Sequence, residues 1–107
     1  MTSPAEICRP DAVPVPAAHV CTANLDDQAV LYDLERRRPI LLNVSASVVW
    51  GALDGVHTVA EVASALAERF GVDTAVVLRD VEATIVRFGE LGLLRGVTPV
   101  FPPDAHR

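Results

Sequence analysis

The side chains that could carry out catalysis are few and lie far apart along this chain. Its three histidines, His19, His57 and His106, have no serine, cysteine or carboxylate spaced with them as a nucleophile and its base would be. Cys8 and Cys21 fit no redox or zinc motif, so we expect two reduced thiols, since a disulfide would require an oxidising compartment. The glycines form no phosphate-binding loop. The sequence predicts no catalytic residues, no metal site and no cofactor, and we expect a protein that binds rather than catalyses.

The size and charge of the chain limit its partners further. A chain of 107 residues forms one domain, which can bury one compact core but hardly an enclosed active site as well. The formal net charge is −5 and all nine basic residues are arginine, which makes the chain a poor partner for phosphate backbones. Its apolar runs are far shorter than the roughly 20 residues that cross a bilayer, and its N-terminus lacks a secretory signal. We expect a cytoplasmic protein that binds neither nucleic acid nor membrane.

Prolines distinguish the two ends of the chain from its middle. Four prolines within the first 17 residues are spaced so that neither a helix nor a central strand fits there. The prolines after Gly96 have the same effect. We therefore expect a flexible Pro-rich tail over residues 1–17, a folded domain over residues 18–95 and a second flexible tail over residues 96–107.

Three short strands are predicted at the start of the folded domain, over residues 19–23, 29–34 and 39–42. Turn residues separate the first two strands. Pro39 begins the third strand, where proline is tolerated only if its missing N–H is not needed. The third strand is therefore expected at the edge of the sheet, with backbone groups open to pair with another chain.

Three helices are predicted after the strands, and their ends carry clear signals. Asn43 or Ser45 caps the first helix, whose large buried residue is expected to be Trp50. Thr58 and Glu61 form a capping box at the start of the second helix. That helix is expected to bury one apolar stripe, which consists of Val59, Val62, Ala63, Leu66 and Phe70.

The third helix is predicted to begin after Asp73 and to end before Gly92. Its apolar residues recur at helical spacing, at Val77, Val81, Ile85 and Phe88. The order of the elements predicts an α+β fold of winged helix-turn-helix type, in which a three-stranded antiparallel sheet is followed by three helices.

An ordered set of short motifs in this domain resembles the PqqD-like family. Over residues 19–95 the motifs are Val30-Leu31-Tyr32-Asp33, Leu41-Leu42-Asn43, Ser45-Ala46, Val49-Trp50, Leu53-Asp54-Gly55, Thr58-Val59, Glu61-Val62, Leu66, Phe70, Asp80-Val81 and Leu91-Gly92-Leu93-Leu94. The resemblance implies a recognition element for precursor peptides that are made on ribosomes and then modified. It also implies that the leader segment of the precursor adds as a strand to the third strand and lies between that strand and the third helix.

The residues expected to bind the leader follow from placing this binding mode on the chain. Independently of the resemblance, an edge strand beside an apolar helix suits a peptide that adds as a further strand. The expected peptide-binding residues are Pro39, Ile40, Leu41, Leu42, Val77, Asp80, Val81, Thr84, Ile85 and Phe88. The expected partners are the leader peptide and a separate modifying enzyme, such as a leader protease, a cyclase or a radical SAM enzyme, and the protein is expected to be a monomer or a weak homodimer.

Other interpretations of the same residues stay open at this point. The spacing of Val81 and Ile85 is more typical of core residues than of groove residues, and Asp80 either pairs with the leader or faces solvent. The arginine run at residues 36–38 is either a solvated turn or a contact for acidic groups of a leader or an enzyme. Winged-helix domains also bind DNA, although the third helix carries more acidic than basic residues. A self-associating structural module would use the same strand edge for a second copy.

Overall fold

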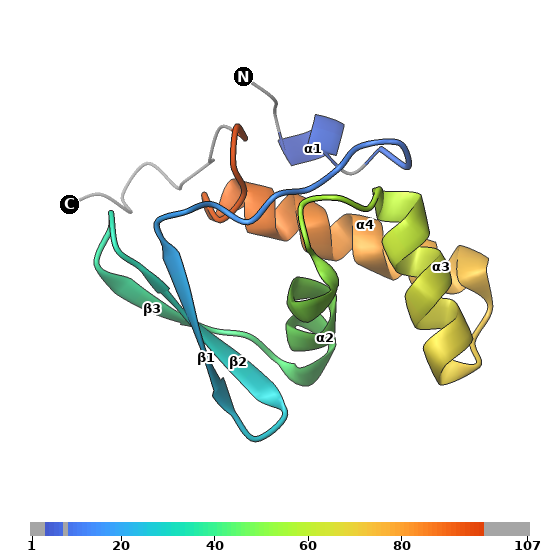
Figure 1. The fold of residues 1–107 in the computed structure, drawn as a ribbon, viewed down its shortest axis with the longest axis horizontal. Helices are drawn as coiled ribbons and strands as arrows, with labels where there is room; N and C mark the ends of the chain where they lie inside the picture. Colours follow the sequence, from blue (N-terminus) through green and yellow to red (C-terminus); the bar gives the residue numbers. More distant parts are fainter. Residues whose placement is uncertain (1–3, 8, 98–107) are drawn as a thin grey trace.

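Three strands precede three long helices along the chain, and the predicted α+β fold is confirmed (Figure 1). The computed structural model describes residues 4–7 and 9–97. The elements are α1 (Pro4–Ile7), β1 (Val20–Leu25), β2 (Gln28–Asp33), β3 (Arg38–Leu41), α2 (Val44–Ala52), α3 (Val59–Phe70) and α4 (Thr74–Glu90). The sheet lies at one end of the molecule and the turn between α3 and α4 lies at the other end.

The three strands form one antiparallel sheet in the order β1-β2-β3. In this register Leu31 of β2 lies opposite Thr22 of β1 and Ile40 of β3. Successive side chains of a strand point to opposite faces, and Leu31 faces the helices and is buried, whereas its neighbour Tyr32 is 40% exposed on the outer face. One face of β2 therefore lies in the core.

The long helices begin at the capping residues that the sequence predicted. The side chain of Asn43 accepts the N–H of Ala46 at the start of α2, and that of Asp73 accepts the N–H of Ala75 at the start of α4. These side chains satisfy N–H groups that have no partner within the helix. Gly71 ends α3 with φ of 65°, in the left-handed region that glycine enters without strain. Local sequence thus determines where each long helix begins and where α3 turns into α4.

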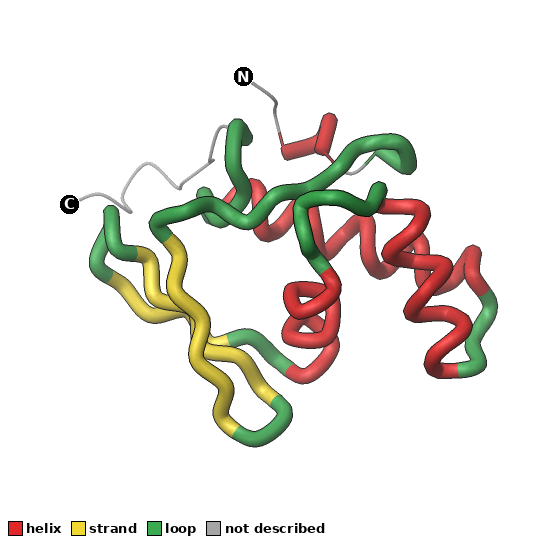
Figure 2. The backbone as a smooth tube through the Cα atoms, viewed as in Figure 1, coloured by secondary structure: helices red, strands yellow, loops and turns green. Residues whose placement is uncertain are grey.

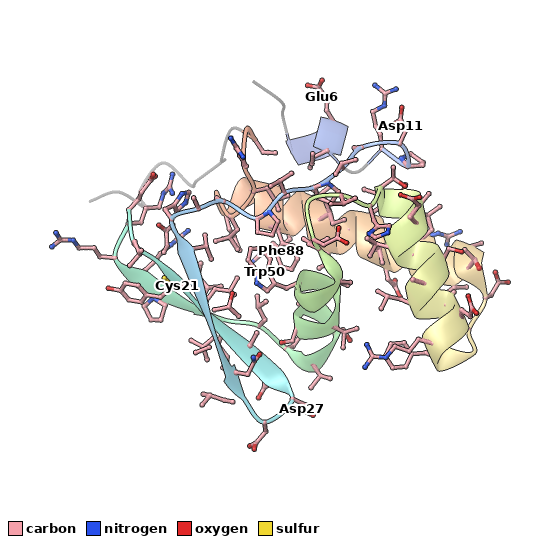
Figure 3. All side chains as sticks on the ribbon, viewed as in Figure 1. Glu6, Asp11, Cys21, Asp27, Trp50 and Phe88 are labelled. Carbon is pink, nitrogen blue, oxygen red and sulfur yellow. The ribbon has the colours of Figure 1, made fainter. Side chains whose placement is uncertain are left out.

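The core forms where α2 and α4 meet the sheet. The rings of Trp50 and Phe88 pack edge to face, with centroids 5.2 Å apart and planes at 84°. Figure 3 shows these two side chains meeting between the sheet and the helices. The Trp50 Nε1–H donates to Thr22 Oγ1 at 3.0 Å, which ties α2 to β1. One aromatic pair therefore connects both helices with the sheet.

The buried stripe of α3 is one turn shorter than predicted. Val59, Val62, Ala63 and Leu66 are buried, but Phe70 is 54% exposed, so its assignment to the core is wrong. Phe70 is the last residue of α3 and lies at the end of the molecule opposite the sheet, where no further element covers it. Its ring lies under the guanidinium of Arg69, 5.1 Å from the ring centroid, in a cation–π contact.

The segment before β1 packs on the domain instead of extending from it. Figure 2 shows this loop running across the helices. The first N–H groups of α3, at Val59 and Ala60, donate to the C=O groups of Ala12 and Pro10 at 2.9 and 3.0 Å. Prolines exclude a helix or strand here, but their C=O groups still accept hydrogen bonds. The described residues up to Ala17 therefore differ from the flexible tail expected over residues 1–17.

The C-terminal boundary of the domain also lies beyond the position expected from the sequence. Pro16 forms an isolated antiparallel bridge with Leu94, and the N–H of Arg95 donates to Val15 C=O at 2.7 Å. Val97 is buried in the core. The packed domain therefore continues past residue 95, while most of the expected second tail, residues 98–107, lies outside the described residues.

Replacing Thr58 with Ala is expected to lower the free energy of unfolding by about 1 kcal/mol. The Thr58 hydroxyl accepts the N–H of Glu61 at 3.1 Å, and the Glu61 carboxylate accepts the N–H of Thr58 at 2.8 Å. Urea denaturation followed by circular dichroism measures the change. Ser64→Ala is the matched control, because Ser64 is exposed in the middle of α3 and loses the same group. An equal loss in both variants would contradict a stabilising role for the capping box.

Candidate functional site

The third strand lies at the edge of the sheet, as predicted from Pro39. The N–H of Leu42 donates to Ala29 C=O at 2.9 Å, and the register places Ile40 opposite Leu31. Hydrogen-bonded and non-hydrogen-bonded pairs alternate along an antiparallel ladder. The backbone groups of Ile40 and Leu42 therefore make the hydrogen bonds to β2. The N–H and C=O of Leu41 and the C=O of Pro39 therefore point away from the sheet, and the missing N–H of Pro39 breaks no bond to β2.

A groove of about 400 Å³ runs beside this edge, between β3 and α4. Its strand side is made by residues 40–42 and its floor by the start of α2 at Asn43, Ser45 and Ala46. The helix side consists of Ala83, Thr84, Arg87 and Phe88, with Leu91 just after the helix. Leu41 is 63% exposed at the rim. An extended chain added to β3 would direct every second side chain into this groove.

The groove contains five of the ten residues predicted to bind peptide. These five are Ile40, Leu41, Leu42, Thr84 and Phe88. The other five do not line it: Pro39 lies on the open edge, Val77 is half-buried, Asp80 is exposed, and Val81 and Ile85 are buried in the core.

The structure also places residues in the groove that the sequence did not single out. Arg87 lies three positions after Thr84, Leu91 three positions after Phe88 and Ala83 four positions before Arg87, so helical spacing would have added them to the list. Asn43, Ser45 and Ala46 enter from α2 through the turn that follows β3, which no periodicity indicates.

Both ends of β3 are fixed by polar contacts. At its start, Arg38 Nη2 donates to Leu91 C=O at 3.2 Å, so the start of β3 lies beside the C-terminal end of α4. After its last residue, Leu42 C=O accepts from the side-chain amide of Gln28 at 3.2 Å. The Ser47 hydroxyl accepts the N–H of Ala29 at 2.8 Å, which links β2 to α2. These contacts hold β3 against the end of α4 at one end and against β2 at the other, and they hold α2 against β2.

The turn between β2 and β3 is organised around Asp33, whose side chain has no exposed surface. Burial by itself would raise its pKa, but the Asp33 carboxylate accepts the backbone N–H groups of Glu35 and Arg36, each at 3.0 Å, and the Arg36 Nη1 at 3.2 Å. These bonds hold the pKa of Asp33 below its ordinary value of 3.8. His19 Nε2 lies 3.8 Å from the same carboxylate and 3.1 Å from Gly92 C=O. Asp33 therefore fixes the turn that leads into the edge strand.

Metal-binding and membrane-spanning features are absent from the part of the chain that the structure describes. Within residues 4–7 and 9–97, no three His, Cys, Asp or Glu side chains lie close enough to hold a metal ion. Over the same ranges, no helix is both long and apolar enough to span a bilayer. Cys21 is exposed and carries a reduced thiol, whereas Cys8 lies outside the described residues.

Comparisons with known proteins point to one family. The family model described as coenzyme PQQ synthesis protein D (PqqD) matches residues 28–94. The structure titled "TbiB1 in Complex with the TbiA(beta) Leader Peptide" is similar over 77% of this chain and 95% of that chain, with 26% identity and a TM-score of 0.69. "Lasso peptide synthetase B1 complexed with the leader peptide" is similar over 78% of this chain and 98% of that chain, with 25% identity and a TM-score of 0.68. No curated protein matches the sequence.

Replacing Asp33 with Asn is expected to lower the free energy of unfolding at pH 7 by about 1 kcal/mol or more, because hydrogen bonds to a charged acceptor are lost. A lowered pKa in the folded state stabilises the protein above the ordinary carboxyl pKa, and this stabilisation disappears as the pH falls through the folded-state pKa. The wild type should therefore lose stability below about pH 4, and the Asn variant should lose less over that range.

Urea denaturation at pH 7, 5, 4 and 3 measures both effects of the Asp33 substitution. Asp27→Asn in the exposed turn between β1 and β2 is the control, and is expected to change the value at pH 7 by less than about 0.5 kcal/mol. Parallel curves for wild type and the Asp33 variant would show that this carboxylate does not contribute to acid sensitivity.

Proposed function

Because this chain belongs to the PqqD family, we propose that it binds the leader segment of a ribosomally made precursor peptide and presents it to a separate modifying enzyme. The family model covers most of the domain, and two similar structures are titled as complexes with leader peptides. The observation that carries the proposal is the open edge of β3 beside the groove. Backbone pairing and side-chain pockets, the two requirements of strand addition, lie side by side there.

The leader would bind as a fourth strand next to β3. Its C=O groups would accept the N–H of Leu41, and its N–H groups would donate to the C=O groups of Pro39 and Leu41. Each such bond contributes only about 0.5–1.5 kcal/mol net, while ordering each leader residue costs about 1–2 kcal/mol. Backbone pairing alone is therefore insufficient, and burial of leader side chains must supply most of the affinity.

The groove offers that burial on one face of the added strand. Ile40 and Leu42 provide apolar surface on the strand side and Phe88 on the helix side, and Ala46 and Ala83 leave room because their side chains are small. Side chains on the other face of the leader would lie beside Leu41 and Pro39 on the outer face of the sheet. Val81 and Ile85, predicted as contacts, would instead support the groove from within the core.

The protein itself would carry out no chemistry in this function. It would hold the leader while a partner enzyme, such as a leader protease, a cyclase or a radical SAM enzyme, acts on another part of the precursor. A peptide made on ribosomes is first available in the cytoplasm, where we place the complex. DNA binding fits the site less well, because α4 carries Asp80, Glu82 and Glu90 against Arg79 and Arg87.

Replacing Leu41 with Pro is expected to weaken leader binding about tenfold while the domain stays folded. The substitution removes the N–H that points away from the sheet, and Leu41 lies opposite Val30 in a pair that makes no backbone hydrogen bonds, so no bond to β2 is lost. Loss of one hydrogen bond in a partly buried site costs about 1–1.5 kcal/mol, which corresponds to a factor of about ten. Fluorescence anisotropy with the leader of the precursor peptide encoded beside this gene measures the affinity.

Leu41→Val is the matched control, because it keeps the N–H and an apolar side chain. Amide NMR spectra check that each variant is folded and locate the bound peptide. Shifts confined to β3, the start of α2 and α4 would support the groove. Normal binding by the folded Pro variant would contradict strand addition, and no binding by the wild type would contradict the proposed function.

A further inference from the structure

Arg87 is the one charged side chain among the described residues that line the groove. The chain carries 14 acidic and nine basic residues, yet the groove lining holds one basic residue and no acidic one. The groove thus has a local charge opposite to that of the chain as a whole. Such a reversal attracts a ligand of complementary sign.

The guanidinium of Arg87 is available to a ligand. Arg87 is exposed, and no side chain in the described part of the chain forms an ion pair or hydrogen bond with it. Glu90, three positions further along α4, is close enough in sequence to pair but does not. By contrast, Arg36 contacts Asp33 and Arg38 contacts Leu91 C=O. Those two arginines stabilise the fold, whereas Arg87 has no such role.

Resting on the proposed function, we propose that Arg87 selects leader peptides that carry an aspartate or glutamate at one groove-facing position. Arginine binds a carboxylate through two parallel N–H groups, which fixes direction as well as distance. The remaining lining is apolar or neutral, so a neighbouring groove-facing residue of the leader should be apolar. The ligand is then an extended peptide that combines an acidic residue with an apolar one on the same face.

The spacing of the two leader residues follows from the geometry of the groove. The start of β3 lies beside the C-terminal end of α4, so an added strand would run along the helix. Side chains two residues apart on a strand are separated by roughly 6.6 Å, and one turn of α4 rises about 5.4 Å. An apolar residue near Ala83 and Thr84 would therefore place the residue two positions away near Arg87 and Leu91.

A peptide library tests this inference whatever the sequence of the natural leader. Random 12-residue peptides displayed on their mRNA are selected against the purified full chain, against Arg87→Glu and against Arg79→Glu. Arg79 is the matched control, because it lies exposed on the same helix but outside the groove lining. Both substitutions change the net charge by the same amount.

The wild type and the Arg79 variant are expected to enrich the same peptides, with an acidic residue two positions from an apolar one. The Arg87 variant should enrich lysine or arginine at that acidic position. A synthetic consensus peptide should bind the wild type about tenfold more tightly than its Asp→Asn or Glu→Gln form, and this preference should vanish in Arg87→Glu.

Two further outcomes separate the inference from the function on which it rests. Enriched peptides that shift the amides of β3 and α4 but show no acidic preference, or the same preference in Arg87→Glu, would overturn the role of Arg87 and leave peptide binding intact. If the folded wild type enriches no peptide, or only peptides that bind elsewhere, both the inference and the proposed function fail.

Discussion

The packing of Phe88 against Trp50 sets the distance between the sheet and α4, and the groove depends on that distance. The two rings meet edge to face at 5.2 Å, and the indole N–H of Trp50 donates to Thr22 on β1. Phe88 is almost fully buried, yet its ring also lines the groove. Because close-packed cores change distances only at high cost, the helix wall of the groove is held in place before any peptide arrives.

The same arrangement explains why β3, and not β1, is the edge suited to an added strand. Both strands are at an edge of the sheet, but β1 is exposed along nearly all of its length. A chain paired with β1 would leave its side chains in water. A chain paired with β3 would place every second side chain against α4 and the start of α2. The edge of β3 therefore combines open backbone groups with a groove that side chains can enter.

Sequence was most informative where structure is decided locally. Asn43, Thr58 and Asp73 cap their helices because a cap needs only a side chain within a few residues of it, and Pro39 indicated the edge strand for a similarly local reason. The prediction that Phe70 is buried was wrong, because helical periodicity does not show where neighbouring elements stop covering a helix. The packing of the N-terminal segment on the domain was not predicted, because its hydrogen bonds to α3 and Leu93 join residues far apart in sequence. The part of the groove lining around the start of α2, at Asn43, Ser45 and Ala46, was missed for the same reason, since it depends on how α2 packs.

In the proposed binding mode, backbone pairing and side-chain contacts would contribute differently to recognition. Hydrogen bonds to an open strand edge are insensitive to peptide sequence, because every residue except proline offers the same N–H and C=O. Discrimination must therefore come from the groove, and an apolar groove distinguishes side chains mainly by size, with modest energies. A single cation in the lining would add a different criterion, because an acidic residue of the peptide would have to lie beside it. This requirement would fix the register of the added strand. In a chain with a net charge of −5, Arg87 has no carboxylate partner among the described residues, and the proposed selection of register would give this groove arginine a role.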